Sequence, residues 1–414
     1  MALCDPSWQG ASKYEDFANL AAYVENDELC RMLLQEAPVY LRPVEYLLTK
    51  VRRWLLVSSA WRRYPRLTEA LIAQAALNGG AWPFDDTERA LLNHEPELSI
   101  VRAYLPVRDV GPGSRANARD DTADRAVAED YERWPYPVWH RITVRPRGHI
   151  RDPFCALDPG GRHNVTANGT WLVAGCGTGK EPATVASAYP DAEVTAVDVS
   201  GASLEYAQRK CAALGISNIR FLKLDLHNVA DLGVQFDVIS CCGVLHHLPD
   251  PEKGWEALVT ALRPNGLMSI MLYSRLGFPN VAAEPDLIGH LTNGPITDDT
   301  VRAVRQRLMD RADSKLARTI INSLDFGTLA GTRDLVLHTQ VHLFDIPRIG
   351  RSLDKLGLGL ASFVLPRPDA IARYNAMFPH DPLHRDLDSW AKFEATEPNV
   401  FKSMYEFWCR RSDR

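Results

Sequence analysis

The stretch TWLVAGCGTGKE, at residues 170–181, decides the fold of this chain. Its first five residues are largely apolar or β-branched and predict a buried β-strand. Glycines at 175, 177 and 179 then allow a tight turn, and a helix is expected to open near Glu181. Backbone N–H groups at such a helix start face a ligand. The spacing is G-x-G-x-G, which is not a Walker loop, and the dinucleotide fingerprint would need glycine where Lys180 stands.

Short β-rich runs alternate with helical stretches on the C-terminal side of this loop. The runs are TWLVA (170–174), EVTAVD (193–198), IRFLKL (219–224), FDVISC (236–241) and GLMSIML (266–272). This alternation predicts an α/β fold built on a parallel sheet. Because the runs are apolar on both faces, helices are expected to cover the sheet on either side.

Two carboxylates stand where the second and third predicted strands end. Asp198 lies at the strand tips, where a carboxylate accepts hydrogen bonds from both hydroxyls of a ribose. Asp225 ends the third run, where it would accept from an exocyclic amine such as that of adenine. Residues 243–250 (GVLHHLPD) then lead into a helix, and 262–266 (LRPNG) turn into the fifth strand. Each feature alone is ordinary loop chemistry, but this order and spacing are hard to obtain by chance.

Over residues 168–275 the sequence resembles the class I, Rossmann-like S-adenosylmethionine-dependent methyltransferases, since four successive motifs of that family fall in order. The resemblance implies a seven-stranded, mostly parallel sheet and S-adenosyl-L-methionine as cofactor, with S-adenosyl-L-homocysteine as product. It implies that the glycines pass under the methionine part, that Asp198 binds the ribose, and that Asp225 and Leu226 frame the adenine. The expected cofactor-binding residues are Gly175, Cys176, Gly177, Thr178, Gly179, Asp198, Val199, Asp225, Leu226, Cys242 and Gly243.

One position departs from that family. Many members carry an acidic residue in the strand before the glycine loop, where this chain has Val173 or Ala174. Recognition of the amino-acid end of the cofactor is therefore expected to come from elsewhere, with the preceding segment YERWPYPVW (131–139) as a candidate.

The same segment is similar to the Y-E-x-N-P-Y-P-R-W motif of a bacterial methyltransferase subgroup sometimes fused to tetratricopeptide repeats, with departures at Trp134 and Val138. Two prolines fix an extended path, along which aromatic side chains present flat amphipathic surfaces. These side chains would either cover the cofactor or form a purely structural clasp. They are Tyr131, Tyr136 and Trp139.

The rest of the sequence predicts helical additions around this core. Apolar residues recur at helical spacing up to residue 105, and residues 106–126, rich in Pro, Gly and charge, are typical of a linker. After the insertion, Leu358–Val364 predicts a strand, and Met404–Cys409 predicts the remaining edge strand. The expected domains are a helical N-terminal domain (1–126), the cofactor-binding core (127–274), a helical insertion that forms a substrate lid (275–335), and the C-terminal completion of the core (336–414).

The substrate-facing wall is expected in RDLVLHTQVHLF (333–344), where Asp, Arg and His gather between apolar residues. Methyl transfer from a sulfonium is an in-line displacement that needs alignment and, for some acceptors, removal of a proton, but no covalent nucleophile. The candidate bases are His338, His342 and Asp334. The candidate substrate-binding residues are Tyr131, Tyr136, Trp139, Tyr273, Arg333 and Gln340. No metal is expected, because the two histidines would suit one only on a helix and no third ligand stands out.

Composition limits the classes of partner. The chain has 414 residues, 46% of them hydrophobic and 24% charged, which is typical of a folded protein of two domains. A net charge of -5 and a pI near 6.2 give no global attraction to nucleic acid or anionic lipid. No apolar run has the length of a membrane span, the start does not read as a leader, and the eight cysteines lack zinc-like spacing. We therefore expect a cytoplasmic protein with reduced thiols and no membrane partner.

Three functions are compatible with these patterns. The first is methyl transfer to a small molecule or to a residue of a protein or peptide, and an enclosing helical insertion favours a sequestered acceptor. The second is a non-catalytic S-adenosylmethionine-binding assembly or regulatory module, with the helical N-terminal domain as its partner surface. The third is a tRNA or rRNA methyltransferase, which the missing basic bias disfavours. A homodimer is compatible with all three.

Overall fold

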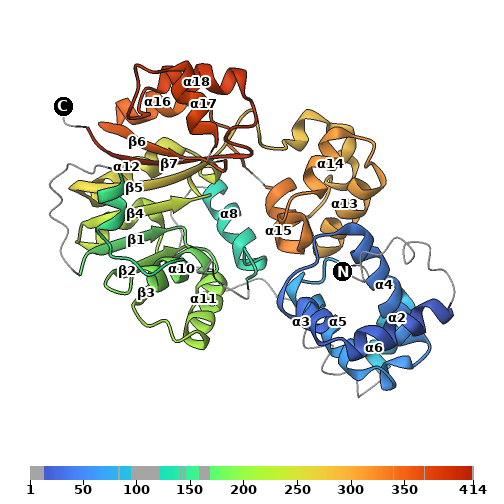
Figure 1. The fold of residues 1–414 in the computed structure, drawn as a ribbon. Helices are drawn as coiled ribbons and strands as arrows, with labels where there is room; N and C mark the ends of the chain where they lie inside the picture. Colours follow the sequence, from blue (N-terminus) through green and yellow to red (C-terminus); the bar gives the residue numbers. More distant parts are fainter. Residues whose placement is uncertain are drawn as a thin grey trace. The chain divides into compact units, whose positions relative to one another are not determined.

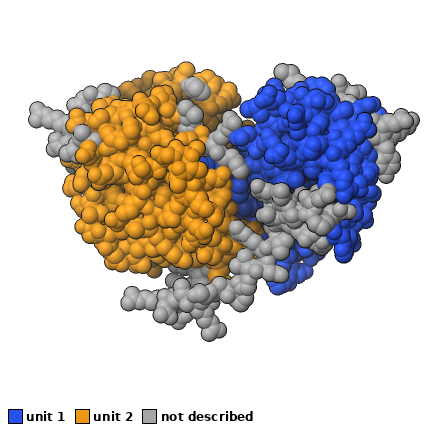
Figure 2. Space-filling view, turned by 90° about the horizontal axis from the view of Figure 1, so that it is seen from below, with its two compact units in different colours: residues 1–115, 138–140, 280–337 blue, residues 116–137, 141–279, 338–414 orange. Residues whose placement is uncertain are grey.

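The computed structural model (Figure 1) describes residues 14–82, 84–94, 122–139, 142, 145–157, 168–338, 340–367 and 369–412. The chain divides into two compact units, which Figure 2 colours separately. Unit 1 comprises residues 1–115, 138–140 and 280–337, and unit 2 comprises residues 116–137, 141–279 and 338–414. Most of the predicted linker, 106–121, lies outside the described residues. The boundary expected at residue 126 falls inside helix α8 (Thr122–Arg133), which belongs to unit 2.

The centre of unit 2 is a seven-stranded sheet of order β3-β2-β1-β4-β5-β7-β6 (Figure 1). Strands β1 to β5 run parallel, and β7 is antiparallel to both of its neighbours. The predicted α/β class, with a mostly parallel sheet, is therefore confirmed. The strands are β1 (Thr170–Ala174), β2 (Glu193–Asp198), β3 (Ile219–Lys223), β4 (Phe236–Cys242), β5 (Leu262–Tyr273), β6 (Leu358–Val364) and β7 (Met404–Arg411).

Two strand predictions are wrong in detail. The C-terminal strand is not at the edge, because β7 inserts between β5 and β6 and leaves β6 outermost. Its alternation is weak because both faces of a strand in that place are partly covered, with Glu406 and Trp408 of intermediate exposure. The fifth strand does not follow a turn, because Leu262 already pairs with Phe236 of β4.

Alternate residues of β1 belong to two different apolar cores, as a sheet covered on both faces requires. Leu172 and Ala174 belong to the core that contains α12 (Pro251–Ala261) and the C-terminal helices. Trp171 and Val173 belong to the core that contains α9 (Asp152–Leu157) and α10 (Lys180–Ala188). The helices of unit 2, besides α8, are α9 (Asp152–Leu157), α10 (Lys180–Ala188), α11 (Gly201–Ala213), α12 (Pro251–Ala261), α16 (Ile346–Lys355), α17 (Asp369–Met377) and α18 (Leu387–Thr396), with short 3-10 helices η4 (Leu226–Leu232) and η5 (Leu245–His247).

Polar caps fix where the helices begin, and hence the shape of the loops before them. Ser200, just past the end of β2, accepts a hydrogen bond from the Ser203 N–H and caps α11. Asp250 caps α12 in the same way, with proline at the next position. Asp345 caps α16 through the Arg348 N–H. These caps hold the loops at the carboxyl ends of the parallel strands, where ligands bind in open α/β sheets.

Unit 1 is helical in all its described parts. Hydrogen bonds join its two longer segments, 1–115 and 280–337: the Leu329 N–H donates to the Asn78 carbonyl over 2.9 Å, and Arg302 Nε donates to the Gly80 carbonyl over 2.8 Å. No helix among the described residues has the length and apolar character that a membrane span needs. The elements are α2 (Tyr14–Asn26), α3 (Glu28–Glu36), α4 (Arg42–Val57), η2 (Ala60–Arg62), α5 (Pro65–Leu77), α6 (Asp86–His94), η6 (Val281–Ala283), η7 (Pro285–Leu287), η8 (Gly289–Leu291), α13 (Asp298–Asp310), α14 (Lys315–Ile321), η9 (Asp325–Gly327) and α15 (Leu329–Val336).

Candidate active site

The glycine loop turns sharply between β1 and α10. The N–H groups of Gly175 and Cys176 both donate to the Val197 carbonyl over 2.9 Å, which ties the loop to β2. Gly177 has φ +50, and a Cβ there would stand 2.7 Å from the carbonyl oxygen of Tyr136. Only glycine fits this close approach, so the sequence requirement at this position is steric as well as conformational.

The segment predicted to cover the cofactor lies directly against this loop. The Thr178 N–H donates to the Tyr136 carbonyl over 3.4 Å, and the Thr178 hydroxyl donates to the Pro137 carbonyl. The Tyr136-Pro137 peptide bond is cis. Earlier in the same segment, the Tyr131 carbonyl accepts from the Ser200 hydroxyl over 3.1 Å. Residues 131–137 therefore run beside both the glycine loop and the start of α11.

Asp198 occupies the predicted position at the carboxyl end of β2 and is 9% exposed. Its Oδ2 accepts from the Gly177 N–H over 2.7 Å and its Oδ1 from the Ser200 N–H over 2.9 Å. Burial raises the pKa of Asp198, while these backbone hydrogen bonds lower it in part. The carboxylate thus connects the glycine loop to the cap of α11, at the place where a ribose is expected.

Asp225 caps η4 after β3. Its Oδ1 accepts from the His227 N–H and lies 2.9 Å from His227 Nδ1, and this pairing lowers the pKa of the carboxyl. Leu226, beside it, is buried. The predicted adenine-binding pair is therefore at a strand end as expected, with a histidine partner that the sequence did not indicate.

The carboxyl end of β4 lies beside that of β1, at the same edge of the sheet. The Cys242 thiol donates to Glu181 Oε1 over 3.4 Å, so a carboxylate from α10 reaches this strand. Gly243 has φ +78, and a Cβ there would meet no atom within 4 Å. Open space, carboxylates and turned backbone N–H groups thus occur together at the ends of β1, β2 and β4, and they fit a nucleoside with a cationic amino-acid tail.

Four imidazoles, which we call the histidine cluster, gather beyond the end of β4: His246, His247, His338 and His342. The rings of His247 and His338 stack, with centroids 3.6 Å apart and planes 12° apart. The His342 N–H donates to the His246 carbonyl over 2.8 Å. Tyr131 connects the cluster to the covering segment, because its hydroxyl lies 3.1 Å from His338 Nε2.

Burial lowers the pKa of His246 well below 6.5, and the three other members of the cluster lower it further. Its Nδ1 accepts from the Tyr273 N–H over 3.3 Å, so the neutral ring carries its proton on Nε2. His247 Nδ1 lies 3.1 Å from the Gln340 carbonyl, which only accepts, so that nitrogen carries a proton. Backbone contacts therefore orient both rings.

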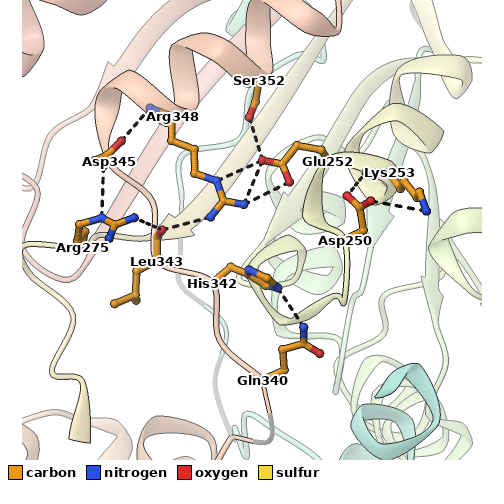
Figure 3. A network of polar contacts seen from close by, with 10 residues as sticks. All are labelled: Asp250, Glu252, Lys253, Arg275, Gln340, His342, Leu343, Asp345, Arg348 and Ser352. Atoms are coloured by element: carbon orange, nitrogen blue, oxygen red, sulfur yellow. Dashed lines mark hydrogen bonds and ion pairs between the residues drawn. The ribbon is translucent and has the colours of Figure 1, made fainter. Parts of the chain in front are cut away.

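An ion-pair network holds the segment that carries His342 (Figure 3). Arg348 makes a bidentate pair with Glu252, at 3.1 and 3.2 Å, and its guanidinium lies 3.9 Å from the centre of the Phe344 ring. Arg275 pairs with Asp345 over 3.3 Å. The network fixes residues 343–345 on the sheet, so the neighbouring Gln340 and His342 side chains, which lie 3.1 Å apart, have a rigid base.

The predicted catalytic and substrate residues are divided between the two units. His338, His342, Gln340, Tyr131, Tyr136 and Tyr273 all belong to unit 2. Asp334, Arg333 and Trp139 belong to unit 1, where all three are buried. Burial lowers the pKa of Arg333 to about 10, and Asp334 raises it in part. The roles of these three residues stay predictions.

Three side chains at the site were not among the predicted site residues. His246 and His247 stand in the LHHLPD turn, where their spacing as neighbours gives no periodic signal, although their position after the fourth strand was a usable clue. Glu181 was recognised only as a helix start. Its contact with Cys242 depends on sheet register, which a local pattern does not reveal.

Comparison with known proteins agrees with this geometry. Residues 172–268 match the family model described as a methyltransferase domain. The chain is 36% identical over 168 residues to an uncharacterised protein of Synechococcus, covering 39% of each chain. It is 33% identical over 98 residues to trans-aconitate 2-methyltransferase of Deinococcus radiodurans, covering 24% of this chain and 35% of the relative.

A solved structure, PKMT2 of Rickettsia typhi in complex with AdoHcy, is also similar, at 18% identity and a TM-score of 0.46, over 60% of this chain and 50% of that one. The chain spans only part of the curated relatives it matches, between 33% and 39% of the length of three of them.

Proposed function

We propose that this chain, which carries an S-adenosylmethionine-dependent methyltransferase domain, transfers a methyl group from that cofactor to a small molecule or to a residue of a protein or peptide. The observation that carries the proposal is the meeting of the glycine loop with Asp198 at the carboxyl ends of β1 and β2. A cofactor with a ribose and a charged amino-acid tail suits that edge of the sheet.

The predicted cofactor residues divide by the part of the cofactor that they would contact. The glycine loop turns under the methionine part, Asp198 accepts from the ribose hydroxyls, and Asp225 with Leu226 borders the adenine. The backbone at Cys242 and Gly243, where a Cβ on Gly243 would meet no other atom, completes the pocket. The full set is Gly175, Cys176, Gly177, Thr178, Gly179, Asp198, Val199, Asp225, Leu226, Cys242 and Gly243.

The bound cofactor supplies a methyl group on an activated leaving group, so the protein's task is alignment and proton removal. His338 is the proposed base, because the Tyr131 hydroxyl and the stacked His247 ring hold it in one orientation. It would take the acceptor proton at Nδ1, with the Nε2–H group donating to the Tyr131 hydroxyl. His342 and Gln340 orient the acceptor from the anchored segment, and Tyr273 and Tyr136 position it.

The sequence pattern also favours Arg333 and Asp334 of α15, and Trp139, as residues that contact the acceptor. Alanine substitution of Asp334 tests this part separately. If turnover on the true acceptor is unchanged, Asp334 does not belong to the site.

Calorimetric titration tests the cofactor assignment directly. Wild-type protein should bind S-adenosylmethionine and S-adenosylhomocysteine with micromolar affinity and should not bind NAD. Asp198→Ala should lower the affinity for both ligands by about 10- to 150-fold, which is the loss expected for hydrogen bonds to a charged group. If the wild type binds neither ligand, the proposal fails. Methyl transfer from labelled S-adenosylmethionine into small-molecule and protein pools then identifies the acceptor class.

A further inference from the structure

The strand before the glycine loop lacks the acidic residue expected from the family resemblance, and the sheet register shows what stands beside that position. Val173, on the face of β1 that α10 covers, pairs in register with Ser240 of β4. Trp171, on the same face, donates from Nε1 to the Ser240 hydroxyl over 3.1 Å. Cys242 lies two residues after Ser240 on β4, so its side chain is on the same face of the sheet as that of Ser240.

Glu181, in the first turn of α10, places its carboxylate over this part of the face. The Cys242 thiol donates to its Oε1 over 3.4 Å. Burial raises the pKa of Glu181, and hydrogen bonds from Ser240 and Cys242 lower it in part. The carboxylate thus stands beside Ser240, the in-register neighbour of Val173, but it comes from the helix and not from the strand.

No cationic side chain in the described part of the chain forms an ion pair with Glu181. Arg145 acts on it only electrostatically, and Glu406, on β7, adds a second negative charge nearby. A partly buried carboxylate without a cationic partner is costly unless a bound ligand provides the positive charge. The same edge of the sheet is where the methionine part of the cofactor is expected.

We propose that the Glu181 carboxylate binds the α-ammonium group of S-adenosylmethionine, in place of the acid that this chain lacks at Val173. The inference rests on the proposed function and deepens it. An ammonium group offers three N–H donors and a full positive charge, which match a carboxylate already held by two weak donors. Glu181 is a positioning residue: by fixing the amino-acid end of the ligand, it fixes the direction in which the methyl group points.

The test compares Glu181→Gln with wild type by calorimetry, using three ligands. S-adenosylmethionine and S-adenosylhomocysteine carry the ammonium group, and 5′-methylthioadenosine lacks the whole amino-acid part. The substitution should lower the affinity for the first two ligands equally, by about 10- to 150-fold. It should change the affinity for the third by less than about twofold. Glu193→Gln, which removes an exposed carboxylate from β2, is the matched control and should change none of the three.

A second measurement compares two ligands on the wild-type protein, so this comparison does not depend on how the variant folds. Wild-type protein should bind an S-adenosylhomocysteine analogue without the amino group more weakly than S-adenosylhomocysteine, by the same factor that Glu181→Gln produces. The variant should no longer distinguish the two ligands.

Several results would overturn the proposal. An equal loss of affinity for all three ligands would mean that Glu181 packs the loop and does not bind the ammonium group. A loss of affinity for S-adenosylmethionine alone would place Glu181 at the sulfonium. Unchanged affinity for every ligand, or a wild type indifferent to the amino group, would also exclude it. Failure of the proposed function gives a different result, since the wild type would then bind none of the ligands.

Discussion

Arg305 and Glu45 form a buried ion pair within unit 1, although 260 positions separate them in the sequence. Arg305 Nη2 donates to Glu45 Oε1 over 2.7 Å, and the two side chains are 1% and 10% exposed. The guanidinium also donates to the Thr332 hydroxyl and lies 4.2 Å from the centre of the Phe326 ring. The pair thus connects α13 with α4, and its charges have partners on several sides.

Removing one partner of this pair should destabilise unit 1 strongly. Arg305→Ala leaves the Glu45 carboxylate buried without its cation, which costs about 3–5 kcal/mol of unfolding free energy. Scanning calorimetry should show that the unfolding transition of unit 1 moves to a lower temperature while that of unit 2 is unchanged. Arg209→Ala, which breaks an exposed pair with Glu205, is the control and should change stability by less than about 0.5 kcal/mol. Equal effects of the two variants would contradict this prediction.

The approach of Tyr136 to the glycine loop makes a prediction about two alanine variants. Gly177 and Gly215 both have positive φ, so alanine at either site carries a similar backbone strain. Only at Gly177 would the new Cβ meet a backbone oxygen, whereas at Gly215 it would meet nothing within 4 Å. Gly177→Ala should therefore lose about 1–3 kcal/mol more stability than Gly215→Ala. Chemical denaturation measures the difference, and S-adenosylhomocysteine affinity should fall only in the Gly177 variant.

The proposed base predicts a kinetic pattern. His338→Ala should lower kcat for methyl transfer by about 10²- to 10⁴-fold with little change in S-adenosylhomocysteine affinity. Tyr131→Phe removes one hydrogen bond to His338 and should lower kcat by only about 2- to 12-fold. His380→Ala, an exposed histidine of unit 2, should retain full activity. Initial rates with labelled cofactor and the identified acceptor give these values, and an active His338→Ala would reject the assignment.

The buried His246 predicts how stability depends on pH. Its pKa is well below 6.5 in the folded protein because burial and the neighbouring imidazoles disfavour the charged ring. Below pH 6.5 the unfolded chain therefore binds more protons at this residue than the folded protein does. Its contribution to stability is lost as pH falls, by up to about 1.4 kcal/mol per pH unit. Denaturation between pH 5.5 and 7 should show a smaller slope for His246→Gln than for wild type, and equal slopes would refute the assignment.

The sheet of unit 2 was largely predictable because its signals are local. An apolar run followed by G-x-G-x-G defines β1 and its loop, and strand ends place Asp198 and Asp225 without knowledge of any distant contact. The family resemblance implied a seven-stranded, mostly parallel sheet, but no strand order was predicted. The place of β7 did not follow from the sequence, because a partly covered inner strand and an edge strand give the same weak alternation.

The contacts that complete each unit were not predictable from local patterns. Glu45 and Arg305 read as ordinary exposed positions on amphipathic helices, and only tertiary packing makes them partners. The histidine cluster has the same origin, since His247 and His338 come from distant segments of the sequence. The segment after His338 is held beside the ends of β4 and β5 by hydrogen bonds from the His342 N–H to the His246 carbonyl and from the Phe344 N–H to the Tyr273 carbonyl. Glu181 reaches Cys242 through the register of the sheet, which no single stretch of sequence encodes.

The discontinuous make-up of unit 1 sets an order for folding during synthesis. When residues 1–115 leave the ribosome, Glu45 has no Arg305, and the Asn78 carbonyl has no Leu329 N–H, until more than half of the remaining chain has been translated. The parallel strands of unit 2 emerge in that interval. The N-terminal helices therefore lack their partner segment while unit 2 is being synthesised. A chaperone that binds nascent chains can act on them during that interval.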